Sequence, residues 1–254
     1  MSVAMESALH RRVVDGAGFY RSVAQQFVEL AADAMRKHGR FRVALAGGST
    51  PKPLYELLAT REFNTRVDWA HTEVFFSDER CVAPDDTRSN FRMAAGALLQ
   101  HVPLPAAQLH RMRGEDDPAL AALSYRQELA AAFRTVTVPR FDLILLGLGE
   151  NGHTASLFPG TAALREFLRS VVPQYVEAQR EWRLTFTRPV LNNAAQLWVL
   201  ACGVAKAEIA QRVLEGRFEP QVLPAQYLRP SAGQLMWWLD AAAAARLQPQ
   251  SGAS

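Results

Sequence analysis

One histidine in this chain stands where it could do acid–base chemistry. His153 ends the run Gly147-Leu-Gly-Glu-Asn-Gly-His, which directly follows the apolar stretch 141–146. A free imidazole has a pKa of about 6.5, so it can take a proton from water near neutral pH. Glycines allow the tight turn that would carry this side chain to the end of a strand. A lone histidine is usually structural, and its position is what makes His153 a candidate general base.

Two predicted helix starts are suited to hold an anion. The segment 47–51, Gly-Gly-Ser-Thr-Pro, follows the apolar stretch 41–46 and opens a predicted helix. Free N–H groups and the helix dipole favour phosphate there, although an ordinary capped turn would have the same residues. Lys206 is one of only three lysines and falls in the first turn of another predicted helix. A cation at that place opposes the dipole, so a bound anion explains it better.

Charged residues follow other predicted strands. Ser77-Asp78-Glu79-Arg80 ends the predicted strand 72–77, and a solvated turn explains it as well as a functional site does. Arg183 and Arg188 flank the residues 184–187 of another predicted strand. Guanidinium groups bind phosphate well, so both arginines are candidate phosphate donors.

Residues 147–152 also fit the Gly-x-Gly-x-x-Gly pattern of a dinucleotide-binding loop. Such a loop opens a long helix, whereas Pro159 and Gly160 would interrupt a helix within two turns. An acidic residue is expected at a strand end about 20 positions further on, but Glu166 lies in a predicted helical stretch. These departures argue against a nucleotide cofactor.

Apolar runs of strand length alternate with segments of helical period. We predict strands at 41–46, 72–77, 141–146, 183–187, 196–202 and 234–239. We predict helices at 18–38, from Pro51, at 90–100, 118–133 and 204–214, and in the Ala-rich segment after the last strand. The alternation predicts an α/β fold: a three-layer αβα sandwich with a mostly parallel central sheet in a single domain. Ligands of such sheets bind beyond the carboxyl ends of the strands, where the loops above would meet.

The composition argues against several function classes. The formal charge of +3 comes from basic residues that are scattered singly, so we expect no nucleic-acid partner. No apolar run approaches the roughly 20 residues of a membrane span, and the first residues lack a signal-peptide pattern, so we expect a cytoplasmic protein without membrane contact. Cys81 and Cys202 have no zinc or redox spacing. Residues 1–247 are predicted to form the domain, and 248–254 a polar, disordered tail.

The sequence resembles the 6-phosphogluconolactonase family over roughly residues 15–245. The motifs that carry the resemblance are Ala44-Leu-Ala-Gly-Gly-Ser-Thr-Pro, Ser77-Asp-Glu-Arg with Ser89-Asn90, the segment 147–160, Arg183-Leu-Thr-Phe-Thr with Leu191-Asn192, and Gly203-Val-Ala-Lys-Ala. The related amino-sugar-phosphate deaminases share the glycine loops. They have Phe-Asn-Glu-Pro where this chain has Ser156-Leu-Phe-Pro, and Asp-Glu-Tyr where it has Asp78-Glu-Arg. These differences favour the lactonase.

The resemblance implies hydrolysis of 6-phospho-D-glucono-1,5-lactone in the oxidative pentose phosphate pathway, with His153 as catalytic base and neither metal nor cofactor. The residues expected to bind the substrate or its phosphate are Gly47, Gly48, Ser49, Thr50, Asp78, Arg80, Asn151, Gly152, Arg183 and Lys206. The family usually has Asp where this chain has Asn151, and the loss of that carboxylate could lower activity unless Glu150 compensates.

Two alternative functions stay open. One is a phosphosugar deaminase or isomerase, and the other is a non-catalytic phosphosugar sensor, which would have no need of His153. The expected partner is a small phosphosugar lactone, and we expect the chain to be a monomer.

Overall fold

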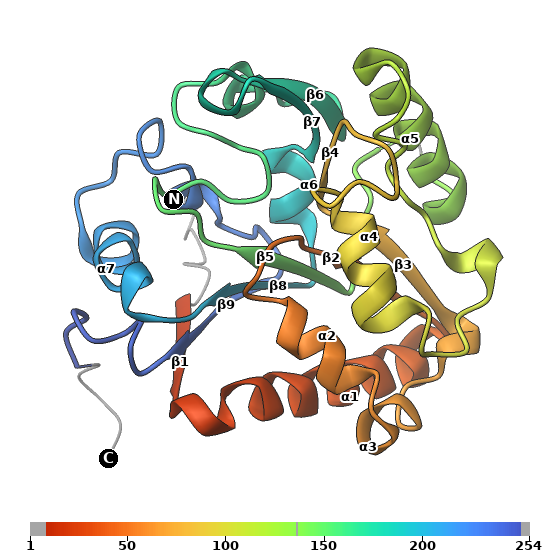
Figure 1. Ribbon diagram of the computed structural model, residues 1–254, viewed down its shortest axis with the longest axis horizontal. Coiled ribbons are helices and arrows are strands. Elements are labelled where there is room, and N and C mark those ends of the chain that lie inside the picture. The colour runs from red at the N-terminus through yellow and green to blue at the C-terminus, as the bar shows by residue number, and fades with distance from the viewer. Residues whose placement is uncertain (1–8, 136, 250–254) are drawn as a thin grey trace, which may run out of the picture.

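The computed structural model describes residues 9–135 and 137–249, which form two sheets surrounded by helices (Figure 1). The strands are β1 (Leu9–Val14), β2 (Phe41–Leu45), β3 (Thr72–Phe76), β4 (Asp78–Arg80), β5 (Leu143–Gly147), β6 (Val171–Val176), β7 (Glu181–Phe186), β8 (Gln196–Ala201) and β9 (Gln234–Asp240). The helices are α1 (Phe19–His38), α2 (Lys52–Leu58), α3 (Arg61–Asn64), α4 (Asn90–Ala94), α5 (Pro118–Phe133), α6 (Arg188–Asn193) and α7 (Ala207–Glu215). Short 3-10 turns and a π-helical segment, Ala95–Leu99, complete the elements.

The larger sheet has six parallel strands in the order β1-β9-β8-β5-β2-β3. From β2 the chain moves outward to β3. It returns to β5 on the other side of β2 and then moves outward through β8 and β9. The winding therefore reverses between β2 and β5, and ligands of open parallel sheets bind at the carboxyl ends of two such strands. The predicted α/β class with a mostly parallel central sheet between helical layers is confirmed.

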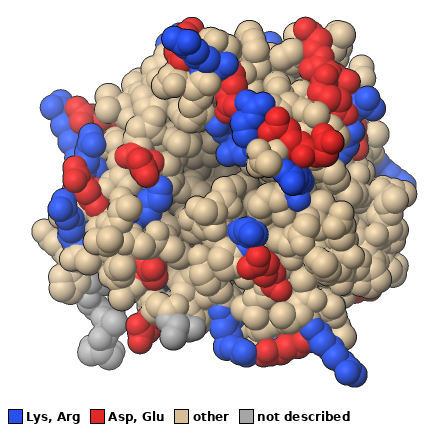
Figure 2. Space-filling model, in the orientation of Figure 1, with Lys and Arg blue, Asp and Glu red and all other residues tan. Residues whose placement is uncertain are grey.

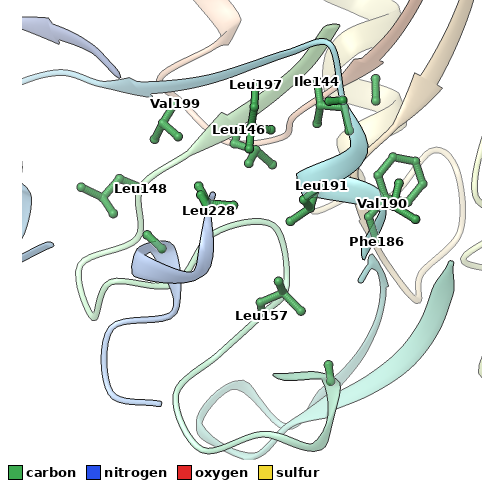
Figure 3. Close-up of a cluster of buried hydrophobic side chains, with 14 of the residues drawn as sticks. Ile144, Leu146, Leu148, Leu157, Phe186, Val190, Leu191, Leu197, Val199 and Leu228 are labelled. Atoms are coloured by element: carbon green, nitrogen blue, oxygen red, sulfur yellow. The ribbon is translucent and has the colours of Figure 1, made fainter. Parts of the chain in front are cut away.

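The run Leu143-Ile144-Leu145-Leu146 shows why this sheet lies in the middle of the molecule. All four side chains are fully buried. Successive side chains of a strand point to opposite faces. Leu143 and Leu145 accordingly pack with residues of α1 and α2, whereas Ile144 and Leu146 pack with residues of α5, α6 and β8. Figure 3 shows part of this second core. Each such side chain stabilises the fold by roughly 1.5–3 kcal/mol.

A second sheet of three antiparallel strands, in the order β4-β7-β6, was not predicted. The prediction placed residues 183–187 in the central sheet, and this is wrong because β7 pairs with β4 and β6 instead. Residue pattern alone does not reveal a strand's partners. The segment of β4 was expected to be a turn or a site loop at the end of the predicted strand 72–77. β1 and β6 were also missed.

The predicted helices are present, except for the one expected after β9. The Ala-rich segment after β9 forms turns and not a helix. The side chain of Asp240 accepts hydrogen bonds from the backbone N–H groups of Ala243 and Gly203, which holds this segment as a turn. Ser49 and Thr50 do not cap α2, because Pro51 occupies the cap position without a side-chain hydrogen bond.

Of the predicted tail 248–254, residues 250–254 lie outside the described residues. Within 9–135 and 137–249, no helix has the length and apolarity needed to cross a membrane.

Candidate active site

A cavity of about 160 Å³ lies at the carboxyl ends of β2 and β5, where the winding reverses. Figure 2 shows the molecular face in the orientation of Figure 1, with a hollow near its middle and lysine and arginine side chains on the rim. The loops after β2, β5 and β8 and the strands β4 and β7 supply the walls. The lining residues are Ala46, Gly47, Gly48, Ser49, Thr50, Pro51, Asp78, Arg80, Asn90, Gly147, Leu148, Gly149, His153, Ala155, Arg183 and Lys206.

The loop after β5 is folded tightly around His153. The backbone N–H of Gly149 donates to the carbonyl of His153 at 2.8 Å, and that of Gly152 donates to the carbonyl of Gly149 at 3.0 Å. Gly152 has a φ of +77°, which favours glycine. A Cβ on Gly149 would lie 2.0 Å from two atoms of the His153 ring. Gly149 is therefore needed so that the imidazole can lie against the backbone.

Asn151 fixes the proton position on the imidazole. Its Oδ1 lies 2.6 Å from Nδ1 of His153 and 3.3 Å from the backbone N of the same residue. The backbone N–H can only donate, so the oxygen of the amide must face it. The same oxygen then accepts a hydrogen bond from Nδ1–H. In neutral His153 this leaves Nε2 without a proton, as a general base requires.

The surroundings of His153 favour its neutral form. Burial lowers the pKa of His153 from 6.5 to about 4, because the charged imidazolium loses water. Asp78 opposes that change, while Arg183, Lys206 and Arg80 lower the pKa further. The imidazole also stacks on Phe158, with ring centroids 4.1 Å apart. At neutral pH His153 is therefore a neutral imidazole.

Three cations line the same cavity. Arg80 and Arg183 are direct cross-strand neighbours in the β4–β7 ladder, and like charges at such positions repel each other. Arg183 pairs with Glu181 at 2.5 Å, and an Nη1 of Arg80 donates to the carbonyl of Arg88. Lys206 has no carboxylate partner within 4.0 Å in the described part of the chain. Together these charges favour an anion in the cavity.

The loop after β2 adds neutral donors to the cations. Within the described residues, none of the backbone N–H groups of 47–50 donates a hydrogen bond to another protein group. All four of these residues line the cavity. Consecutive free N–H groups before a helix are a common cradle for phosphate oxygens.

Asp78 and Asn90 form a buried polar pair in the cavity lining. Asp78 Oδ2 accepts a hydrogen bond from Ser156 Oγ at 2.7 Å, and Nδ2 of Asn90 donates to the Asp78 carbonyl at 2.9 Å and to Oδ1 at 3.2 Å. Glu79 lies behind them and accepts from the backbone N–H groups of Asn90 and Phe91, each at 2.7 Å. Burial raises the pKa of Glu79. These bonds fix β4 to the start of α4.

The structure brings together nine of the eleven residues predicted for the site: His153, Gly47, Gly48, Ser49, Thr50, Asp78, Arg80, Arg183 and Lys206. Asn151 and Gly152 shape the histidine loop but do not line the cavity. Arg188 points elsewhere, since its guanidinium lies 3.5 Å from the centre of the Tyr227 ring.

Sequence reasoning missed the roles of two lining residues, Asn90 and Gly149. Asn90 belongs to the Ser89-Asn90 motif of the family resemblance, and this motif could have indicated that Asn90 lies in the site. Gly149 was seen as part of a glycine run, but nothing in the sequence showed that it contacts the histidine ring.

A larger groove of about 640 Å³ lies at the amino-terminal edge of the central sheet. Its lining has five cations, Lys37, Arg40, Arg42, Arg134 and Arg140, against the two carboxylates of Asp33 and Asp142. Lys37 pairs with Asp33 at 2.6 Å, and Arg42 pairs with Glu73 at 2.7 Å. Parallel sheets bind ligands at the other edge. The smaller cavity is therefore the candidate site.

Among residues 9–135 and 137–249, no three His, Cys, Asp or Glu side chains gather as metal ligands.

Known proteins resemble this chain over most of its length. A family profile described as glucosamine-6-phosphate isomerases/6-phosphogluconolactonase matches residues 15–237. The 6-phosphogluconolactonase of Synechocystis sp. is 41% identical over 219 residues, which cover 85% of this chain and 88% of that protein. That of Nostoc sp. is 38% identical over 217 residues, covering 84% and 88%. The solved structure of 6-phosphogluconolactonase from Trypanosoma cruzi is similar with a TM-score of 0.85 and 28% identity, covering 97% of this chain and 99% of that one.

Proposed function

This chain belongs to the glucosamine-6-phosphate isomerase/6-phosphogluconolactonase family and hydrolyses 6-phosphogluconolactone, and we propose that His153 is the general base of that reaction. The reaction opens the lactone ring in the pentose phosphate pathway. The observation that best supports the role of His153 is its bond to Asn151, which leaves Nε2 unprotonated beside the cavity. A general base needs both an available lone pair and access to the reacting water.

The proposed reaction starts with a proton transfer from water to Nε2 of His153. The water oxygen attacks the carbonyl carbon of the lactone and forms a tetrahedral intermediate. The bond between that carbon and the ring oxygen then breaks, and the proton on Nε2 passes to the ring oxygen. One water is thus added across the ester bond and the imidazole is regenerated. No serine or cysteine nucleophile is needed.

The cations and free N–H groups are proposed to hold the phosphate of the substrate. Lys206 would supply a point charge, and Arg80 with Arg183 would supply planar N–H donors. A dianion between the two arginines would also relieve their mutual repulsion across the β4–β7 ladder. Anchoring the phosphate fixes the lactone carbonyl relative to His153, so binding energy at a remote group speeds the reaction.

The variant His153→Ala tests the proposed base. We expect its kcat to fall by about 10²–10⁴-fold while 6-phosphogluconate still binds with an unchanged Kd. His71→Ala is a matched control, because His71 is an exposed histidine that pairs with Asp68 outside the cavity. Rates are measured on freshly generated lactone and corrected for spontaneous opening. An activity of His153→Ala within about threefold of the wild type contradicts the role.

The remaining expectations from the sequence stay predictions. They are a cytoplasmic location, a monomeric state, independence of metal and cofactor, and no nucleic-acid partner.

A further inference from the structure

Asn151 raises a question about charge in the proposed mechanism. When Nε2 of His153 takes a proton from water, the imidazole becomes a cation. Oδ1 of Asn151 accepts a hydrogen bond from Nδ1–H of His153, with the two heavy atoms 2.6 Å apart, and so orients the ring. The amide carries no charge. The imidazolium is also surrounded by cations, since Arg80, Arg183 and Lys206 line the same cavity. A protonated His153 therefore needs a counter-charge from another element.

Asp78 is the one carboxylate among the described residues that line the cavity. It lies on β4 and is only 6% exposed, so its charge is weakly screened by water. The other charged groups of the lining are the three cations. A bound phosphate would offset the cations and leave Asp78 as the anion available to His153.

The carboxylate of Asp78 is tied to the loop that carries the histidine. Ser156, three residues after His153, donates its hydroxyl to Oδ2 of Asp78 at 2.7 Å. The backbone N–H of Ser156 donates to Oγ1 of Thr185 on β7 at 3.1 Å, which fixes the same loop to the antiparallel sheet. Asn90 donates to Oδ1 of Asp78 at 3.2 Å from the other side. Two hydrogen bonds thus fix the position of the charge.

We propose that Asp78 is the counter-charge of His153: its carboxylate, held by Ser156 and Asn90, stabilises the imidazolium that forms during water activation and takes over the part that the neutral Asn151 cannot play. This role rests on the proposed function of His153 as general base. Asp78 raises the pKa of His153 and so favours the protonated form, whereas Arg183, Lys206 and Arg80 lower it. Asp78 acts on the reaction through His153 and is a positioning residue.

The first test replaces the charge while keeping the shape. In Asp78→Asn we expect kcat to fall by about 3–30-fold, since an opposite charge near a titrating group is worth about one to three pKa units and a general-base rate follows only part of such a change. The pKa of His153 is measured by NMR titration with 6-phosphogluconate bound, and it should fall by about one unit or more. Asp33→Asn is the matched control, because it removes a carboxylate that pairs with Lys37 on α1. It should change neither quantity.

A second variant separates the lost charge from a structural defect. Asn151→Asp places a carboxylate at the Nδ1 side of the ring, 2.6 Å from the nitrogen in the present geometry. If Asp78 acts through its charge, Asp78→Asn combined with Asn151→Asp should regain at least about threefold in kcat over Asp78→Asn alone and recover the pKa of His153. Misfolding of the β4 region would not be repaired by a charge on a different loop.

The outcomes distinguish this inference from the proposed function. Loss of activity in Asp78→Asn with a lowered His153 pKa and rescue by Asn151→Asp supports the counter-charge. Loss without a pKa change and without rescue overturns it, as does an active Asp78→Asn enzyme when His153→Ala is inactive. If His153→Ala is itself active, the proposed general base is wrong, whatever Asp78 does.

Discussion

Asn151→Asp, made in the otherwise unchanged chain, should raise the pKa of His153. The new carboxylate would replace an amide oxygen that already accepts a hydrogen bond from Nδ1–H and lies 2.6 Å from Nδ1. With the positive charge spread over the ring, an effective separation of about 4 Å and an effective dielectric constant of about 20 give an attraction of about 4 kcal/mol, or about three pKa units. Because the cavity opens to solvent, a shift of about one to two units is more realistic. The pKa of unliganded His153 should therefore rise from about 4 to between about 5 and 6.

The sign of the effect on rate follows from the base role. A higher pKa keeps His153 protonated, and hence inactive, up to a higher pH, so the acid limb of kcat/KM should move upward by the same one to two units. On the plateau above pH 7 the more basic imidazole should raise the rate several-fold. The phosphate of the substrate also titrates near pH 6, in the same way for both enzymes, so the difference between the two profiles carries the information. An NMR titration of the imidazole measures the pKa independently.

Two results would refute this reasoning. An unchanged acid limb together with an unchanged imidazole titration would mean that the side chain at 151 does not contact Nδ1 in solution. A raised pKa without any movement of the limb would mean that His153 is not the group whose protonation stops catalysis. Gln100→Glu is a suitable control, because it makes the same change from amide to carboxylate at an exposed residue that does not line the cavity.

Three further predictions address other parts of the site. Lys206→Ala should lower kcat/KM on 6-phosphogluconolactone by about 10–100-fold, since a charge-assisted bond to phosphate is worth about 1.5–3 kcal/mol, and should hardly change the slow hydrolysis of unphosphorylated gluconolactone; equal losses on the two lactones would remove Lys206 from the phosphate site. Gly149→Ala should lower kcat by at least about tenfold while the chain stays folded, because the new Cβ would lie 2.0 Å from atoms of the His153 ring and force the imidazole to move; wild-type rates with normal circular dichroism would contradict that contact. Incubation with EDTA should leave activity unchanged, and an activity lost to the chelator and restored by a divalent cation would refute the predicted metal independence.

Much of the fold is encoded in local sequence patterns. The run Leu143-Ile144-Leu145-Leu146 is apolar throughout, and a strand with that pattern must be covered on both faces, which requires helical layers on either side. The glycine turns after β2 and β5 mark where these strands end. Since the carboxyl ends of parallel strands share one edge, the sequence by itself determined that the loop 47–50, His153 and Lys206 would meet. Six of the predicted residues line the cavity for this reason: Gly47, Gly48, Ser49, Thr50, His153 and Lys206.

The tertiary structure decided what depends on contacts between distant residues. Arg80 and Arg183 are 103 positions apart, and only the antiparallel β4–β7 pairing places them opposite each other. The bond from Ser156 to Asp78 joins the loop after β5 to β4 in the same way. Strand pairing and side-chain hydrogen bonds across such separations leave no periodic signal in the sequence. The residues near each partner in the chain are compatible with many different pairing partners. The sequence therefore singled out the groups for which we propose a chemical role, and the packing of the two sheets determined which of those groups lie together.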